Sequence, residues 1–370
     1  MKVMHIVTKA DVGGAQTYVL ELATAQLGDG HEVVIVAGTL GAMAAEAQRR
    51  GITVMEESAL RREVGGLSEF RAARRLRERI TGFGPDIVHA HSSKAGVLAR
   101  VAGRSARVPT VYTAHGWPFQ VGAAVPQRIV SWLGETAMGH WWGHVICLTE
   151  AEASLAHRWG VVRRRRLHVV PNGLPDVPAV VRAATASSSV TIVMVARFAP
   201  PKAQRDVLQA VGLMPAGDWV VQFVGDGPEF EAVRNSPEAA AAGGRVQFLG
   251  HRDDIGEILA AADVGLLWSR YEGMPLALME AMRAGLVCVA NDLPGVHALL
   301  GADAGMILDF RPEVLADALA ALIADPARRA ELGAAARRRF EHEFSMDRHL
   351  TRVLAVYDAA TADLGVRADR

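Results

Sequence analysis

The sequence predicts an α/β protein of two domains, each a doubly wound parallel sheet, that face each other across a cleft. The 370 residues, half of them hydrophobic, suffice for two cores at roughly 150 residues per domain. Short apolar runs alternate with helix-prone segments, a pattern typical of parallel strands covered on both faces by helices. The alternation stops at residues 174–189, where two prolines and a serine run indicate a linker, and then begins again.

The first half begins with a β-α-β unit. An apolar strand starting near Met4 leads through the Gly13-Gly14 turn into a helix, and a second strand follows at residues 33–36. The other strand candidates of this half are residues 52–55, 86–90, 110–113, 145–148 and 168–170.

The second half repeats the pattern. Its strand candidates are residues 190–195, 219–224, 246–249, 264–268, 287–290 and 306–308. Residues 346–362 predict a last helix that crosses back to the first domain. We therefore expect one domain over 1–175 together with about 346–370, and a second over 176–345. Ligands of such sheets bind beyond the carboxyl ends of the strands, which directs attention to the loops that follow them.

Charge and cysteine content exclude several classes of protein. Forty Lys+Arg residues balance forty Asp+Glu residues, which excludes a wholly basic nucleic-acid-binding protein and a charge-rich disordered chain. Cys147 and Cys288 are too few for a disulfide framework and favour a reducing compartment. No apolar run reaches the ~18 residues of a membrane-spanning helix, and the N-terminus shows no cleavable signal pattern. We expect a cytoplasmic protein, soluble or peripheral at the inner face of the cell membrane.

Positive charge is concentrated in the first half, with 21 Lys+Arg against 14 Asp+Glu residues over 1–175. Residues 68–83 predict an arginine-rich amphipathic helix with Phe70 on or near its apolar face. A second basic run at 163–166 and three tryptophans complete the pattern: Trp132, Trp141 and Trp142. Such segments bind anionic membrane surfaces. Solvated basic helices with the tryptophans in the core fit the same residues.

The segment SRYEGMPLALMEAMRAG, residues 269–285, carries the strongest chemical pattern. Glu272 follows a strand, Pro275 suits the first turn of a helix, and Glu280 comes eight residues after Glu272. A helix N-terminus between the two carboxylates would bind phosphate through backbone N–H groups. These groups belong to Gly273, Met274 and Leu276. The arrangement suits a nucleotide diphosphate sugar, with hydroxyls at both ends and a diphosphate between them.

A second constellation, VARFAPPKAQRDVLQA at 195–210, places Arg197 directly after a strand and Lys202 just before a helix. A guanidinium and an ammonium group together can neutralise a diphosphate and stabilise it as a leaving group. Taken singly, each of these residues has a structural explanation: a solvated surface for the cations, and a helix-dipole partner for Glu272.

Together these segments resemble the family 4 glycosyltransferases, whose fold is called GT-B and whose hallmark is two glutamates separated by seven residues. The resemblance extends through most of the chain. Further matching segments are GGAQTYVLELA, PDIVHAHSSKAG at 85–96, TAHGWPF at 113–119, VPNG at 170–173 and FVGDGPE at 223–229. It implies that the first domain binds the acceptor and the second binds the nucleotide sugar.

The resemblance also implies roles in the second domain. Glu272 would contact hydroxyls of the donor sugar and Glu280 those of the ribose, while Arg197 and Lys202 would contact the diphosphate. The loop at 250–255, with Arg252, would meet the nucleobase.

In the first domain, His115 would hydrogen-bond the sugar. Gly13 and Gly14 would allow close approach of the diphosphate or acceptor, so bulkier residues there should block the site. Gly13-Gly14, His115-Gly116 and Gly225-Asp226-Gly227 are also typical of plain turns. His89 and His91 alternate on a strand, but no third ligand is placed near them in the sequence, so we expect no metal site.

The resemblance implies transfer with retention of configuration, without metal or other cofactor. We expect front-face attack, with a phosphate oxygen of the departing nucleotide taking the acceptor proton. The donor expected from the family is a uridine diphosphate sugar, and the acceptor a cell-surface glycan or a polyprenyl-linked sugar, because TAHGWPF resembles capsule and exopolysaccharide enzymes. The alternatives are a small soluble glycoside as product, or a non-catalytic nucleotide-sugar-binding scaffold.

Overall fold

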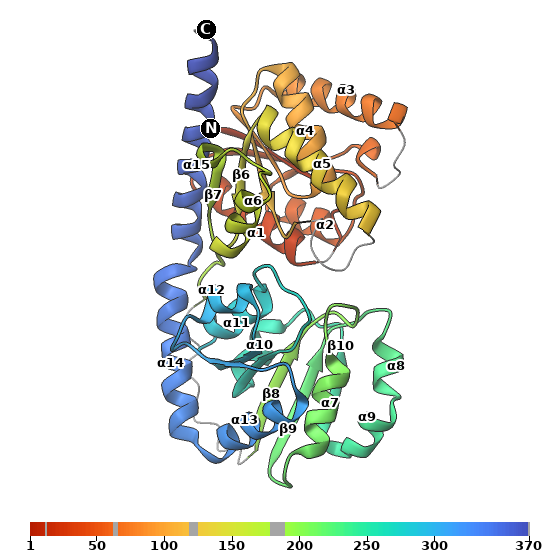
Figure 1. The fold of residues 1–370 in the computed structure, drawn as a ribbon, viewed down its shortest axis with the longest axis vertical. Helices are drawn as coiled ribbons and strands as arrows, with labels where there is room; N and C mark the ends of the chain where they lie inside the picture. Colours follow the sequence, from red (N-terminus) through yellow and green to blue (C-terminus); the bar gives the residue numbers. More distant parts are fainter. Residues whose placement is uncertain (12, 62–65, 118–124, 178–188, 369–370) are drawn as a thin grey trace. The chain divides into compact units, whose positions relative to one another are not determined.

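The computed structural model describes residues 1–11, 13–61, 66–117, 125–177 and 189–368. The chain divides into two compact units (Figure 1). The first comprises Met1–Pro175 and Met346–Arg370, and the second comprises Asp176–Ser345. Each unit is a parallel sheet flanked by helices, which confirms the predicted fold class. Most of the predicted linker, residues 178–188, lies outside the described residues.

The sheet of the first unit has seven strands in the order β3-β2-β1-β4-β5-β6-β7. Their bounds are β1 (Lys2–Val7), β2 (Glu32–Ala37), β3 (Thr53–Glu56), β4 (Ile87–Ala90), β5 (Thr110–Ala114), β6 (His144–Cys147) and β7 (Leu167–Val169). Every pair in the sheet is parallel. The strand order reverses between β1 and β4, which are neighbours, and such a reversal is where ligands bind in this kind of sheet.

Helices cover both faces of this sheet. They are α1 (Gly14–Gly28), α2 (Ala42–Arg49), α3 (Gly66–Phe83), α4 (Ser93–Ala106), α5 (Val125–Trp141), α6 (Glu150–Arg158) and α15 (Met346–Ala368), with short 3-10 turns η1 (Ser58–Leu60) and η2 (Arg164–Arg166). Side chains alternate along β1 with period two. Met4 and Ile6 enter an apolar core with residues of α3 and α4, whereas His5 faces Gln26 of α1.

Helix α15 joins the first unit although it comes from the end of the chain. It packs against α1 and β5. Three contacts fix it: the Tyr357 hydroxyl forms buried hydrogen bonds with Gln26 and His89, and Arg166 donates to the half-buried Asp363. None of the described helices is both long and apolar enough to cross a lipid bilayer.

The sheet of the second unit has six parallel strands in the order β10-β9-β8-β11-β12-β13. Their bounds are β8 (Val190–Val195), β9 (Trp219–Val224), β10 (Val246–Gly250), β11 (Val264–Leu267), β12 (Val287–Asn291) and β13 (Met306–Leu308). Here the order reverses between β8 and β11, so the loops after these two strands emerge side by side.

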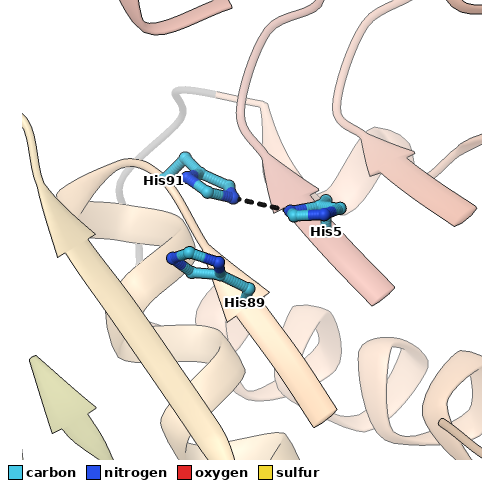
Figure 2. A group of neighbouring side chains, drawn as sticks. All are labelled: His5, His89 and His91. Carbon is cyan, nitrogen blue, oxygen red and sulfur yellow. Dashed lines mark hydrogen bonds between the residues drawn. The ribbon is translucent and has the colours of Figure 1, made fainter. Parts of the chain in front are cut away.

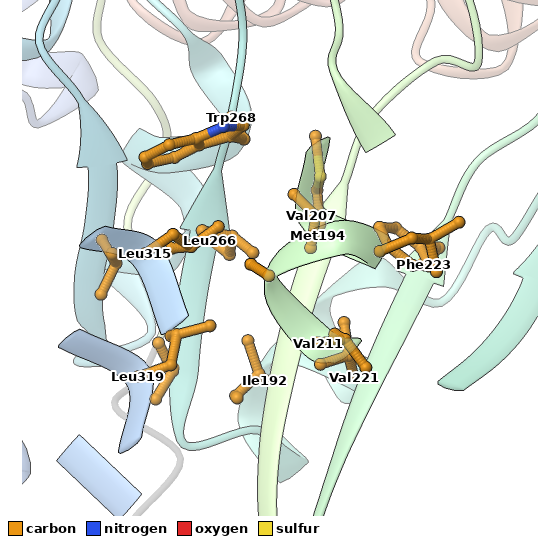
Figure 3. Packing of buried hydrophobic residues seen from close by; sticks show 14 of the residues in the cluster. Ile192, Met194, Val207, Val211, Val221, Phe223, Leu266, Trp268, Leu315 and Leu319 are labelled. Atoms are coloured by element: carbon orange, nitrogen blue, oxygen red, sulfur yellow. The ribbon is translucent and has the colours of Figure 1, made fainter. Parts of the chain in front are cut away.

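The helices of the second unit are α7 (Gln204–Leu213), α8 (Phe230–Arg234), α9 (Pro237–Ala242), α10 (Ile255–Ala261), α11 (Leu276–Arg283), α12 (Pro294–Leu300), α13 (Pro312–Ala324) and α14 (Pro326–Glu343), with the 3-10 turn η3 (Gly243–Arg245). Inward residues of the central strands meet α7 and α13 in a dense apolar core (Figure 3). Trp268, directly after β11, is fully buried and belongs to that core. The loop that follows it therefore starts from a rigid anchor.

Candidate functional site

In the second unit, the loops that follow β8 and β11 are tied together by backbone hydrogen bonds. The N–H of Ala203 donates to the carbonyl of Trp268 at 3.0 Å, and the N–H of Arg270 donates to the carbonyl of Pro201 at 2.9 Å. The two loops carry Lys202 and Glu272, which lie 70 residues apart in the sequence. The sheet therefore brings both predicted site residues to its switch point.

Lys202 and Glu272 form an ion pair through Nζ and Oε1. The two side chains are 18% and 12% exposed, so the pair is largely shielded from solvent. The resemblance gave these residues separate targets, a diphosphate and a sugar, and it did not predict that they bind each other. In this pair the ammonium group and the carboxylate neutralise each other. A ligand that binds Lys202 separates the pair, so the same ligand must also provide new hydrogen-bond partners for the Glu272 carboxylate.

Arg197 is exposed in the loop after β8, and a glycine turn fixes its neighbours. The N–H of Ala196 donates to Val224 and that of Phe198 to Asp226, at 2.9 and 3.0 Å. Gly225 has a φ of 134°, and a Cβ there would lie 2.2 Å from the carbonyl oxygen of Ala196. Gly225 and Gly227, which have no side chains, thus let the backbone that carries Arg197 approach closely.

Helix α11 begins at Leu276, with Pro275 as its N-cap residue. Gly273 and Met274 precede it, so the expected phosphate-binding N–H groups do lie at a helix N-terminus. Glu280 is half-buried on the helix itself. Arg252 is exposed in the loop after β10, where its guanidinium binds the Asp254 carboxylate, with Nε and Oδ1 2.7 Å apart.

Three predicted residues lie in the first unit. Gly13 is the N-cap residue of α1, which starts at Gly14. The φ of Gly13, 168°, is extended and open to any residue, and a Cβ there would meet only the end of the Gln16 side chain. The backbone at Gly13 therefore does not itself require glycine. Residues 118 and 119 of the TAHGWPF segment lie outside the described residues.

His115 follows β5, one strand away from the switch point. Its Nε2 is buried and has no partner among the described residues. Burial lowers the pKa of His115 from 6.5 to about 4, because a low-dielectric surrounding disfavours the charged imidazolium. His115 is therefore neutral at pH 7, a form that can accept or donate one hydrogen bond to a hydroxyl group.

The expectation that no third histidine lies near His89 and His91 is wrong. His5 on β1 is the register partner of His89 on β4, and one ring nitrogen from each of the three histidines lies within 4.8 Å of the others (Figure 2). The sequence hid this neighbour because His5 and His89 lie 84 positions apart in the chain. Parallel pairing of the two strands on either side of the switch point is the signal that would have found it.

These three rings belong to a hydrogen-bonded chain that fixes their tautomers. The amide oxygen of Gln26 can only accept, so His5 Nε2, 2.7 Å away, carries a hydrogen. His5 Nδ1 then accepts from His91 Nε2 at 2.8 Å. In the same way the Gln26 amide donates to Tyr357, so the Tyr357 hydroxyl donates to His89 Nδ1 at 2.7 Å.

Both ring nitrogens of His5 and of His89 have hydrogen-bond partners, since His89 Nε2 also lies 2.7 Å from the Thr113 hydroxyl. We call the five neighbouring histidines the imidazole cluster: His5, His89, His91, His115 and His349. Burial lowers the pKa of each member, to about 4 for His5 and His349. For His89 and His91 the charges of neighbouring histidines lower the pKa further. The absence of a bound metal stays a prediction.

Two doubly wound domains in one chain are the architecture called GT-B in glycosyltransferases. Residues 13–173 match the model of the glycosyl transferase 4-like domain, and residues 182–339 match that of the glycosyl transferases group 1. The chain belongs to family 4 of the GT-B glycosyltransferases.

Two relatives illustrate the range of this family. The UDP-Gal:alpha-D-GlcNAc-diphosphoundecaprenol alpha-1,3-galactosyltransferase of Escherichia coli is 33% identical over 234 residues, which span 58% of this chain and 60% of that enzyme. The D-inositol 3-phosphate glycosyltransferase of Xylanimonas cellulosilytica is 30% identical over 388 residues, 95% of this chain and 93% of that enzyme.

Among solved structures, Anabaena Alr3699/HepE in complex with UDP and glucose superposes with a TM-score of 0.82 at 20% identity. The superposition covers 97% of this chain and 99% of that one. It shows that the two proteins share a fold.

Proposed function

We propose that the protein is a retaining glycosyltransferase that moves a sugar from a nucleotide diphosphate sugar, with uridine as the base, to a lipid-linked or cell-surface glycan acceptor. The observation that carries the proposal is the Lys202–Glu272 pair at the β8–β11 switch point, with the start of α11 beside it. The galactosyltransferase relative supports the donor and acceptor classes, since its name gives a UDP-sugar and a diphosphoundecaprenol-linked sugar.

In this proposal the donor exchanges the partners of the ion pair. The diphosphate binds Lys202, Arg197 and the N–H groups before α11. Hydroxyl groups of the sugar donate hydrogen bonds to the Glu272 carboxylate. As the bond to the anomeric carbon breaks, negative charge grows on the diphosphate, and these fixed cations and dipoles stabilise it. A phosphate oxygen accepts the proton of the acceptor hydroxyl. Neutral His115 holds a sugar hydroxyl, and Glu280 holds the ribose.

A donor panel tests the proposal. Binding to the native state raises its stability, by about 2.7 kcal/mol at a ligand concentration of 100 times Kd. We therefore expect a uridine diphosphate sugar to raise the melting temperature more than guanosine or adenosine diphosphate sugars do. The same donor should release nucleoside diphosphate when acceptor is added, with or without EDTA. Binding without release would indicate a scaffold, and loss of release in EDTA would contradict metal-independent transfer.

A small soluble acceptor is the second candidate. It is favoured by the D-inositol 3-phosphate glycosyltransferase relative, whose match covers 95% of this chain. Dependence on detergent separates the two cases, because a polyprenyl-linked acceptor needs a micelle or membrane and a polyol phosphate does not.

The first unit offers a surface for an anionic membrane, and we place the reaction at the cytoplasmic face of that membrane. Ile129 and Leu133 on α5 are 52% and 54% exposed, and Trp159 is 48% exposed. The ring of Trp132 lies 6.4 Å from that of Trp159, so these side chains lie close together. Arg158 directly precedes Trp159 in the sequence, and Arg163, Arg164 and Arg165 follow it; all four are exposed. Exposed apolar groups together with exposed arginines suit an anionic bilayer surface.

Two details of the predicted membrane segments change. Phe70 is 74% exposed and does not lie with the buried face of α3, which contains Ala72, Leu76 and Ile80. The tryptophans differ in exposure: Trp142 is buried, whereas Trp141 is 39% exposed and its ring lies under the guanidinium of Arg104. The tryptophans are therefore neither all in the core nor all on the surface.

Liposome flotation tests this surface. We expect the protein to float with phosphatidylglycerol vesicles at low salt and less so at high salt, since salt screens the arginines. The double variant Ile129→Ser, Leu133→Ser should float less at either salt concentration. Leu213→Ser removes an equally exposed leucine of α7 in the second unit and should change nothing. Flotation that is absent at low salt, or equal in all three proteins, argues against this surface.

A further inference from the structure

The loop that carries Glu272 is fixed from the side by Asn291, the last residue of β12. Pairing of β11 with β12 ends at Leu267 and Ala290. One position further, the buried Asn291 side chain takes over: Oδ1 accepts from the N–H of Ser269, and Nδ2 donates to the carbonyl of Ser269, both at 2.9 Å. A primary amide bonds both backbone groups of one residue, so it continues the sheet where the strands have separated.

Ser269 in turn joins the two loops of the site. Its hydroxyl lies 3.0 Å from the carbonyl oxygen of Tyr271 and 3.3 Å from that of Pro201. Its backbone forms an isolated bridge with Lys202. Asn291 therefore holds the residue on which the positions of both Lys202 and Glu272 depend, although it lies on a third strand.

Gly295, in the first turn of α12, closes the other side of this loop. A Cβ there would lie 1.9 Å from the carbonyl oxygen of Gly273 and 3.1 Å from that of Glu272. A real Cβ does not fit at such a distance, so any other residue must push the Gly273 carbonyl group, and with it the Gly273–Met274 peptide, away. Glycine is required here for close approach.

We propose that Asn291 and Gly295 are positioning residues that set the geometry of Lys202 and Glu272 for sugar transfer. This inference rests on the proposed function. Neither residue need touch a substrate. Asn291 determines where the loop leaves the sheet, and Gly295 determines how closely the loop at Glu272 and Gly273 packs against α12. Sequence reasoning missed both because they lie about twenty residues after Glu272, beyond the motif.

Asn291→Asp is the sharper variant. It keeps the size of the side chain and the acceptor for the Ser269 N–H, but it sets a carboxylate oxygen against the Ser269 carbonyl in place of a donor. Misplacing a catalytic group by about 1 Å can cost 10²-fold in rate. We expect kcat/KM to fall by roughly that factor, mainly through kcat, which is the signature of a contact needed in the transition state.

Gly295→Ala supplies an independent variant with the same expected signature. The matched controls are Gly212→Ala on α7, where a Cβ would meet nothing within 4 Å, and Asp292→Asn, an exposed neighbour of Asn291. Both should keep wild-type kcat and KM. Hydrogen exchange at the Ser269 amide gives a readout without turnover, and it should accelerate in Asn291→Leu, which removes the acceptor.

The outcomes separate the two proposals. Rates are divided by the folded fraction from circular dichroism, so a merely structural role would leave kcat per folded molecule unchanged and would overturn positioning. Wild-type kcat in both Asn291→Asp and Gly295→Ala would also overturn it. A wild-type protein that neither binds nor turns over any donor overturns the proposed function first, and the positioning role with it.

Discussion

Lys202→Ala is expected to lower turnover by about 10²–10³-fold, the usual effect of removing one preorganised electrostatic donor from a transition state. The expectation follows from the position of Lys202. Its ammonium group is largely shielded, and its only described ion-pair partner is Glu272. A charge held in such a place acts more strongly on a growing diphosphate charge than it would in water. The measurement is release of nucleoside diphosphate from the preferred donor.

Glu272→Gln separates this explanation from a loss of stability. The glutamine cannot hold Lys202 as an ion pair, so UDP alone should bind more tightly to this variant than to wild type, while transfer of sugar falls. Arg50→Ala serves as control, because it breaks a half-buried pair with Glu21 in the first unit, where Nη1 and Oε1 are 3.0 Å apart. It should leave turnover intact. Weaker UDP binding by Glu272→Gln, or normal turnover by Lys202→Ala, would refute the partner exchange.

Acidification should unfold the first unit between about pH 6.5 and pH 4. The members of the imidazole cluster have pKa values lowered from 6.5, to about 4 for His5, His115 and His349. In the unfolded chain they bind protons as pH falls below 6.5, whereas in the native state they stay neutral. Their contribution to stability is therefore complete above pH 6.5 and is lost as pH falls toward 4.

The size of this effect follows from linkage. Each histidine whose pKa falls from 6.5 to about 4 on folding lowers the stability of the native state by about 3 kcal/mol at pH 4. Domains are stable by only about 5–15 kcal/mol. Two or three such residues therefore suffice. Thermal melts from pH 7.5 to pH 4, with hydrogen exchange to identify the unit that opens, measure it. His349→Gln should move the acid midpoint to lower pH, and His297→Gln, an exposed residue of α12, should not. Loss of the second unit before the first would contradict the prediction.

Much of the fold follows from local patterns in the sequence. The strands β8, β9 and β13 begin and end at the predicted residues. Each is a short apolar run that follows a residue interrupting the hydrophobic pattern: Ser189, Asp218 or Gly305. Bounds shift by a residue or two elsewhere, as at β11, where Trp268 continues the apolar run after pairing has ended. At Trp268 the hydrophobic side chain indicates that the residue is buried, but it does not indicate whether the backbone is still paired in the sheet.

The candidate site was predictable as a set of residues but not as a set of contacts. Motif spacing and the family resemblance predicted Glu272, Glu280, Arg197 and Lys202, since these depend only on the order of residues along the chain. The Lys202–Glu272 ion pair depends on which strands become neighbours, and strand order is not written in any local pattern. The same reason hid His5 from His89. Contacts between residues on strands that meet at a switch point can be predicted only once the order of the strands in the sheet is known.

The origin of helix α15 has a consequence for biosynthesis. Its Tyr357 and Asp363 satisfy Gln26, His89 and Arg166, groups that are buried in the completed protein. A buried polar group without its partner costs about 1–3 kcal/mol. On the ribosome these groups must wait until residues 346–368 have been translated, whereas 176–345 emerges as one uninterrupted stretch. The second unit can thus mature before the first one does, and residues 1–175 are the part that most needs protection until α15 has emerged.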